Sequence, residues 1–185
     1  ATDDDGSCTY AEENFDCDGI CIENIDCNGQ CGGTALADEC GTCDDNSQND
    51  CFDYIMELHS GANLISFCAL PSDKSLTNIF DSLGDNITGV ITEGGAASQI
   101  APGTWVGSIT EIDSTKGYWV ILSSDGILLI NDAIPLDLNT EYCLHSGANL
   151  ISFPSCASAG IGASLPDDAE PYISGIITEG GAASQ

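Results

Sequence analysis

The sequence has almost no positive charge. It contains no arginine, and its only lysines are Lys74 and Lys116, against 30 aspartates and glutamates, so that the formal net charge is -28 at pH 7. Such a surface repels phosphate groups, which excludes nucleic acid and anionic membranes as partners. The chain also lacks an apolar run long enough to cross a bilayer, so we expect no membrane insertion.

Large apolar side chains are scarce in residues 1–57. This segment instead carries 16 of the 30 acidic residues and eight of the 11 cysteines, with no lysine or arginine. A segment so short and so poor in apolar side chains cannot build a core, and it needs cross-links or ions to become stable. The composition therefore predicts an acidic, Cys-rich connector over residues 1–57, followed by a different kind of structure.

Zinc-ligand spacing is nearly absent. Only Cys40 and Cys43 form a C-x-x-C pair, and both histidines lie far from it. Residues 17–21 and 27–31 instead form two C-D/N-G-x-C units. This pattern favours disulfides, and hence an extracellular location, over zinc in a reducing compartment.

Three stretches of the connector combine an acidic residue, a spacer, an Asp or Asn and a glycine: residues 3–6, 16–19 and 26–29. Alternate carboxylates and amides in a tight turn bring oxygens together, and the glycine permits the left-handed backbone. Sixteen carboxylates without a basic residue also need cations from outside to become compact. The alternative is that Asp and Gly simply form turns on a solvated charge run. The predicted calcium ligands are Asp3, Asp5, Asp16, Asp18, Asp26, Asn28, Asp38, Asp44, Asn46 and Asp50.

A module is repeated along the rest of the chain. Residues 58–67, LHSGANLISF, recur unchanged as residues 144–153, and residues 92–99, TEGGAASQ, recur as residues 178–185, both at an offset of 86 (144 - 58 and 178 - 92). We call residues 58–137 the first copy and residues 138–185 the second copy. The second copy stops where the first continues to about Pro135. We expect either an array that continues or a module completed by a neighbouring subunit, with decay of the second copy as the alternative.

Short apolar segments between turn residues predict that each module is mainly β, a β-sandwich or a barrel-like domain. One helix is expected over residues 75–83, because its four large apolar residues share one face. In the second copy Pro166 weakens this pattern. Strands are predicted at residues 63–68, 87–92, 104–106, 117–122 and 127–130.

The odd number of cysteines leaves one thiol without a partner. Cys143 and Cys156 flank the first strand of the second copy and could form a disulfide, which would leave Cys68 unpaired. The cysteines expected in disulfides are Cys8, Cys17, Cys21, Cys27, Cys31, Cys40, Cys43, Cys51, Cys143 and Cys156.

Residues 1–51 resemble the Asp- and Cys-rich repeats of very large secreted proteins of marine and environmental, Bacteroidetes-like bacteria. They are more loosely similar to the calcium-wrapped type 3 repeats of thrombospondin, but they lack the longer D-x-D-x-D-G-x-x-D series of that family. In the first copy, GANLISF and KGYWV resemble motifs of extracellular β-domains found beside sorting or attachment domains, with Ala62, and Ala148 in the second copy, in place of a tryptophan. The resemblance implies a secreted, calcium-binding surface protein.

No catalytic group is evident. His59 and Ser60 are neighbours in sequence, and side chains of neighbours in a strand point to opposite faces, so we expect a structural histidine rather than a nucleophile and its base. Trp105 and Trp119 could stack on a sugar, although core packing is the commoner role of such residues. Asn86 begins an N-x-T glycosylation pattern, a short motif with many false positives.

These observations predict a structural, non-enzymatic protein of an extracellular filament, stalk or surface fibre. Half a sheet in the second copy would expose apolar strand edges, and a strand from a following segment or another subunit would cover them. Such a contact is head to tail and produces filaments. The alternative is a non-catalytic adhesin or carbohydrate-binding module that contacts surface polysaccharide.

Overall fold

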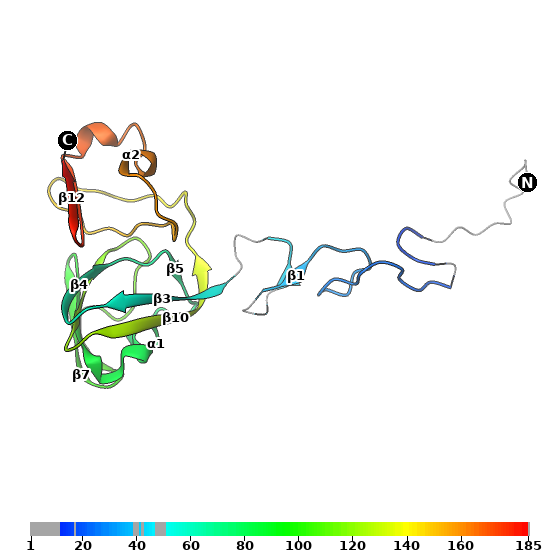
Figure 1. Cartoon of the computed structure of the whole chain (residues 1–185), viewed down its shortest axis with the longest axis horizontal. Coiled ribbons are helices and arrows are strands. Elements are labelled where there is room, and N and C mark those ends of the chain that lie inside the picture. Colours follow the sequence, from blue (N-terminus) through cyan, green and yellow to red (C-terminus); the bar gives the residue numbers. More distant parts are fainter. Residues whose placement is uncertain (1–11, 17, 39–40, 42, 47–50, 185) are drawn as a thin grey trace, which may run out of the picture. The chain divides into compact units, whose positions relative to one another are not determined.

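The computed structural model describes residues 12–16, 18–38, 41, 43–46 and 51–184. The chain forms two compact units, Ala1–Cys51 and Phe52–Gln185 (Figure 1). The division thus falls at Cys51 and not at residue 57, because the next residues are a strand of the β-module. Six of the residues predicted as ligands or disulfide partners lie outside the described residues: Asp3, Asp5, Asp50, Cys8, Cys17 and Cys40.

The first unit has little regular structure. Its strands β1 (Leu36–Ala37) and β2 (Cys43–Asp44) form a short antiparallel pair. Disulfides join Cys21 to Cys31 and Cys27 to Cys43. Its larger apolar side chains, such as Ile25, are mostly exposed. The described part of this unit therefore depends on cross-links rather than on a core, as its composition predicts.

The second unit contains two larger antiparallel sheets, which confirms a mainly β module. One sheet has the order β4-β9-β6-β7-β8 and the other the order β3-β10-β5, with β3 and β10 side by side (Figure 1). Neither order returns to its first strand within the described residues, so no barrel closes there. The strands of the first sheet are β4 (Gly61–Ile65), β6 (Ile87–Thr92), β7 (Gly95–Ala101), β8 (Thr104–Gly107) and β9 (Tyr118–Leu122), and those of the second are β3 (Phe52–Leu58), β5 (Ala69–Leu70) and β10 (Gly126–Pro135).

Both sheets and one helix contribute to a single core. Helix α1 (Leu76–Ile79) begins at Ser75, whose hydroxyl accepts a hydrogen bond from the backbone N–H of Asn78, as an N-cap does. The four apolar residues of the predicted helix face are buried, which confirms that face. The helix is shorter than predicted, because the chain continues as a 3-10 helix, η1 (Asp81–Asn86), with Gly84 at a φ of 51°.

The predicted strands all occur in the first copy, β6 with the predicted ends and the other four with shifted ends, but three strands were missed. Strand β3 reads F-D-Y-I-M-E-L and alternates between inward and outward side chains. That period of two was visible in the sequence, but the acidic residues made the segment look like connector. Strands β5 and β7 are poor in strand-forming residues and are determined by pairing with β10 and β6.

The second copy forms only part of this arrangement. Helix α2 (Ile161–Ser164) and the 3-10 helix η2 (Glu170–Tyr172) take the place of α1 and η1, and Pro166 lies between them. Strands β11 (Gly175–Thr178) and β12 (Gly181–Ser184) form a hairpin equivalent to β6 and β7. The counterpart of β4, residues 147–151, makes one isolated bridge, from Ile151 to Lys116 of the first copy.

Candidate functional site

The junction between the two copies is built from the same side chains on both sides. The Nε2 atom of His59 lies 2.6 Å from Oε1 of Glu179, and Nε2 of His145 contacts Oε1 of Glu93. The offset of 86 relates the two histidines to each other and the two glutamates to each other. Each copy thus contributes one histidine and one glutamate to the contact, which is the pattern of a two-fold, isologous contact.

Each glutamate also binds a backbone amide of the opposite copy. Oε2 of Glu179 accepts a hydrogen bond from Leu64 N at 2.5 Å, and Oε2 of Glu93 accepts one from Leu150 N at 3.2 Å. One carboxylate therefore holds both an imidazole and a strand end. We call this set the reciprocal clamp; it consists of His59, Leu64, Glu93, His145, Leu150 and Glu179.

An asparagine positions each histidine. Oδ1 of Asn63 accepts a hydrogen bond from His59 N, and Nδ2 of Asn63 donates to His59 O, both at 2.8 Å. Asn149 makes the same two bonds with His145, each at 2.9 Å. The repeated letters H-S-G-A-N therefore encode a loop that forms in the same way in both copies and presents the imidazole to the junction.

The clamp favours a charged imidazole. The pKa of His59 is raised by its contact with the carbonyl of Ser60 and by Glu179, and the pKa of His145 is raised by the carbonyl of Ser146 and by Glu93. The pKa of Glu93 is lowered by the hydrogen bond from His145 and by that from Leu150 N. Because these groups are solvent-exposed, the ion pairs contribute little stability and mainly orient the copies.

A short strand contact and a disulfide complete the junction. Gly117 N donates to Leu150 O at 3.0 Å, and Ser152 N donates to Thr115 O at 3.1 Å. These bonds place the second copy along the segment that precedes β9. The junction is therefore held by main-chain pairing as well as by side chains.

The disulfide pairing expected in the second copy was wrong. Cys156 is bonded to Cys68 of the first copy, with a Cα–Cα distance of 5.1 Å, and Cys143 is exposed and free. Cysteines pair when the fold brings their Cα atoms within reach, and here packing of one copy on the other does so. Cys68 is thus a bonded residue that sequence reasoning missed. Cys51, in the connector, is also disulfide-bonded, as expected.

The histidine and serine of the repeated motif do not form a catalytic pair. Nδ1 of His59 lies 2.7 Å from the carbonyl oxygen of Ser60, and the Ser60 hydroxyl donates instead to Ser123 O at 3.2 Å. The other ring nitrogen of His59 contacts Glu179. Both ring nitrogens of His59 therefore have partners other than the Ser60 hydroxyl, and one of these partners lies across the junction.

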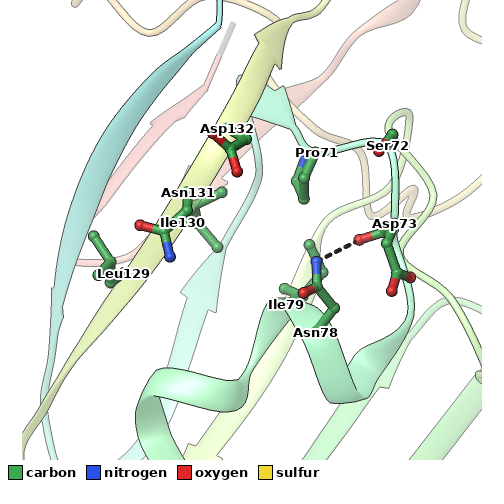
Figure 2. A pocket seen from close by; sticks show the side chains of 9 residues that line it. All are labelled: Pro71, Ser72, Asp73, Asn78, Ile79, Leu129, Ile130, Asn131 and Asp132. Atoms are coloured by element: carbon green, nitrogen blue, oxygen red, sulfur yellow. Dashed lines mark hydrogen bonds between the residues drawn. The ribbon is translucent and has the colours of Figure 1, made fainter. Parts of the chain in front are cut away.

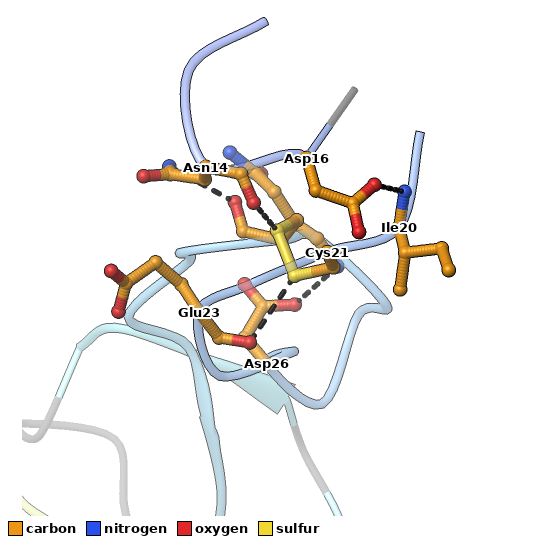
Figure 3. The surroundings of a disulfide bond; sticks show 8 residues. Asn14, Asp16, Ile20, Cys21, Glu23 and Asp26 are labelled. Atoms are coloured by element: carbon orange, nitrogen blue, oxygen red, sulfur yellow. Dashed lines mark hydrogen bonds between the residues drawn. A yellow bond between two sulfur atoms is a disulfide. The ribbon is translucent and has the colours of Figure 1, made fainter. Parts of the chain in front are cut away.

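The acidic motifs of the first unit form turns with glycine in the left-handed region. Oδ1 of Asp16 accepts hydrogen bonds from Asp18 N at 2.9 Å and from Ile20 N at 2.8 Å, the second of which Figure 3 shows. Asp26 makes the corresponding bonds to Asn28 N and Gln30 N. Gly19 and Gly29 have φ values of 77° and 83°. The turns predicted at residues 16–19 and 26–29 are confirmed, and in both the leading aspartate uses one carboxylate oxygen to cap its own turn, while residues 3–6 lie outside the described residues.

Two further predicted calcium ligands, Asp44 and Asp38, also accept hydrogen bonds from backbone N–H groups a few residues later in the chain. Oδ1 of Asp44 accepts from Asn46 N, and the carbonyl of Asp38 accepts from Gly41 N. Across the described parts of the chain, no three histidine, cysteine, aspartate or glutamate side chains gather in one place. Calcium binding therefore stays a prediction.

A longer pattern was present in the sequence but was not recognised. Residues 16–21, 26–31 and 38–43 share the form D-x-x-G-x-C, which also occurs at residues 3–8. In the three described glycines of this pattern φ is positive, and the glycine N–H donates to the carbonyl of the leading aspartate. The pattern predicts a series of equivalent turns, and the Cys21–Cys31 disulfide joins the ends of two of them.

The two tryptophans considered for sugar binding differ in burial, and the asparagine of the glycosylation pattern is hydrogen-bonded within the fold. Trp105 packs against the core, with its ring centroid 5.9 Å from that of Phe80, whereas Trp119 is 39% exposed. The Asn86 side chain is occupied: Nδ2 donates to the carbonyl of Ser124, and Oδ1 accepts from Ser123 and Ser124. The N-x-T pattern therefore includes an asparagine with a structural role.

One shallow pocket lies between the start of α1 and the irregular part of β10 (Figure 2). Oδ1 of Asp73 accepts from Ser75 N, and the side chain of Asn78 donates to the Asp73 carbonyl. Across the pocket, Asp132 has a φ of 50°, and its N–H donates to Asp53. These hydrogen bonds hold the backbone on both sides of the pocket.

No protein-family model, curated protein or solved structure matches the chain. Within the described residues, no helix has the length and apolar character needed to cross a membrane. The three disulfides among those residues indicate an oxidising environment.

Proposed function

We propose that the chain is a structural part of an extracellular stalk, filament or surface fibre, in which repeated sandwich-like β-modules alternate with acidic Cys-rich connectors. The observation that carries this proposal is the junction, where a disulfide, a strand contact and a reciprocal clamp join two copies of one module. A cross-link between Cys68 and Cys156 opposes separation of the copies outside the cell. No catalytic step is part of the proposal.

The internal junction suggests how such a fibre would be organised. A reciprocal contact closes on itself, whereas filaments need open, head-to-tail contacts. A pair of modules would therefore form one bead, and the connectors would arrange beads head to tail. Copies of the same chain are the expected partners, with strand donation as the means of joining.

Calcium would act in the connector. Sixteen acidic residues without a basic residue repel each other, and bound cations would reduce that repulsion and stiffen the segment. The turns led by Asp16 and Asp26 hold neighbouring carbonyl and carboxylate oxygens in fixed positions, which supports the proposal.

The test is electron microscopy and limited proteolysis of the disulfide-bonded chain in calcium, in magnesium and in EGTA. We expect linear assemblies in calcium, and faster cleavage within residues 1–51 after chelation. Equal cleavage rates in all three buffers would remove calcium from the proposal. Single particles at every protein concentration would argue against a fibre.

A carbohydrate-binding adhesin is the second candidate, favoured by one observation. Trp119 is 39% exposed and lies opposite Ile91, which is 43% exposed, on the outer side of the first sheet. A glycan array probed with the native chain and with Trp119→Ala would decide. Binding that Trp119→Ala abolishes, with an unchanged unfolding midpoint, would favour the adhesin.

A further inference from the structure

The strands of the first sheet carry no charge, although the chain as a whole is highly acidic. Strands β4, β6, β7, β8 and β9 contain no aspartate, glutamate, lysine or arginine, whereas the chain has 30 acidic residues and a formal net charge of -28. The second sheet differs, because β3 exposes Asp53 and Glu57 on either side of Ile55. The first sheet thus presents an uncharged surface where the second sheet presents carboxylates.

The outer side of the first sheet consists of paired residues from its three middle strands. Residues such as Val90, Ala97 and Val120 are buried on the inner side, and their neighbours along each strand face outward. Two rows cross β9, β6 and β7 in that order: Trp119, Ile91 and Ala96 form one row, and Ile121, Gly89 and Ser98 form the other. We call these six residues the uncharged face.

The uncharged face leaves large apolar side chains open to solvent. Trp119 is 39% exposed and Ile91 is 43% exposed, although they lie side by side. Among the six residues, Ser98 has the only polar side chain. A sugar needs hydrogen-bonding groups beside a stacked ring, so this composition suits a protein surface better than a polysaccharide.

The two outer strands of the face differ in side-chain size. Strand β9 contributes Trp119 and Ile121, whereas β7 contributes Ala96 and Ser98. A two-fold axis that runs along β6 would bring two identical faces together with β9 of each copy over β7 of the other. Large side chains of one copy then meet small side chains of its partner, as they do between the packed sheets of a sandwich.

Charge explains why a second copy would use this face. Two chains with a net charge of -28 repel each other, and placing carboxylates of both in one contact would also require their desolvation. The strands of the first sheet have no carboxylate to desolvate. We propose that two copies of the chain pair laterally through the uncharged face, with Trp119 of each copy packed on Ala96 and Ser98 of the other. The proposed fibre uses head-to-tail contacts, so this inference goes beyond the proposed function and does not rest on it.

The experiment is analytical ultracentrifugation of the full disulfide-bonded chain in EGTA, which removes calcium-dependent assembly. We expect a monomer–dimer equilibrium that shifts toward the dimer as NaCl is added, because salt screens the repulsion between acidic chains and leaves apolar burial intact. Ser98→Asp places a charge inside the contact and should raise the Kd by at least about tenfold. The matched control is Ile55→Asp, which adds the same charge at a position of the second sheet that is 58% exposed.

Complementary variants test which residues meet in the dimer. Trp119→Lys and Ala96→Asp should each weaken self-association, whereas an equal mixture of the two should form a heterodimer. In the heterodimer the lysine of one chain lies over the aspartate of the other. Native mass spectrometry distinguishes this species by its mass, and an unchanged urea midpoint shows that each variant is folded.

Three results would overturn the proposal. A chain that stays monomeric at every salt concentration, up to about 1 mM protein, has no lateral contact of useful affinity. A dimer that Ser98→Asp and Ile55→Asp weaken equally is held by another surface. A monomer that binds glycans through Trp119 assigns the face to polysaccharide. All three are read without calcium and without fibres, so they are separate from the test of the proposed function.

Discussion

Residues 58–67 and 144–153 have the same ten letters but different structures. In the first copy they include strand β4, which pairs with β9 over Gly61–Ile65, whereas in the second copy they make one isolated bridge. The His–Asn loop at the start of the motif is nevertheless the same in both. The comparison separates what a local sequence decides from what its neighbours decide.

The hairpins of the two copies, in contrast, have the same structure. Strands β6 and β7 pair with Thr92 opposite Gly95, and β11 and β12 pair with Thr178 opposite Gly181. Gly94 and Gly180 have nearly equal φ values of 75° and 76° in the turns. A two-residue turn that needs a positive φ defines its register locally, so this element forms with or without the rest of the module.

The largest expected difference between the copies concerns the two equivalent phenylalanines. Phe67→Ala should destabilise the β-module by about 3–5 kcal/mol, because it creates a cavity beside Phe80 and Tyr118. Phe153→Ala should cost less than about 1 kcal/mol, because Phe153 is 37% exposed. Urea unfolding measures both, and equal losses would contradict the difference in burial.

The disulfide comes next. Cys68→Ser or Cys156→Ser removes a cross-link with a sequence separation of 88 residues and should cost about 2–5 kcal/mol. Protease should then cleave the second copy before the first. Cys143→Ser is the matched control, since Cys143 is free and exposed. A loss in the Cys143→Ser variant equal to that in Cys68→Ser would contradict this pairing.

A smaller difference is expected at the two asparagines that position the histidines. Asn63→Ala leaves the N–H and carbonyl of His59 without partners in a site where Asn63 is 2% exposed, and it should cost about 1–3 kcal/mol. Asn149→Ala removes the same bonds where water can replace them, so its cost should be below about 1 kcal/mol. Thermal unfolding of the two variants tests this, and a larger loss for Asn149→Ala than for Asn63→Ala would contradict the effect expected from burial.

The smallest effect is the pH dependence of the clamp. Both histidines have a raised pKa, so their contribution is complete below about pH 6.5 and is lost as the pH rises through the raised values. Glu93 has a lowered pKa, so its contribution is present above about pH 4.5 and is lost as the pH falls through the lowered value. The clamp should therefore be strongest between about pH 4.5 and 6.5.

Titration of the two imidazoles by NMR measures this effect. Glu93→Gln should bring the pKa of His145 back toward its ordinary value and leave His59 unaffected, which makes His59 an internal control. If both histidines titrate at the ordinary value in the native chain, the clamp does not form in solution.

Much of the module could be predicted from apolar periodicity. The face of α1 and the strands from β6 to β10 that carry branched and aromatic residues were found in this way, because their patterns match the burial of one face. Strand β7 was missed because its residues G-A-A-S-Q-I-A have little strand propensity, and pairing with β6 determines it. At the junction, the sequence showed only that the histidine is repeated. Its partners Glu93 and Glu179 could not be predicted, because they are distant in sequence.

Residues close to one another along the chain determine the turns, the His–Asn loops and the hairpin registers, and local composition makes the connector depend on cross-links. Three other features could be seen only in the folded chain: Cys156 bonds with Cys68, each glutamate holds the histidine of the other copy, and Phe67 is buried while Phe153 is exposed. These features depend on contacts between distant segments, and burial is a property of the covering segment as much as of the residue that is covered.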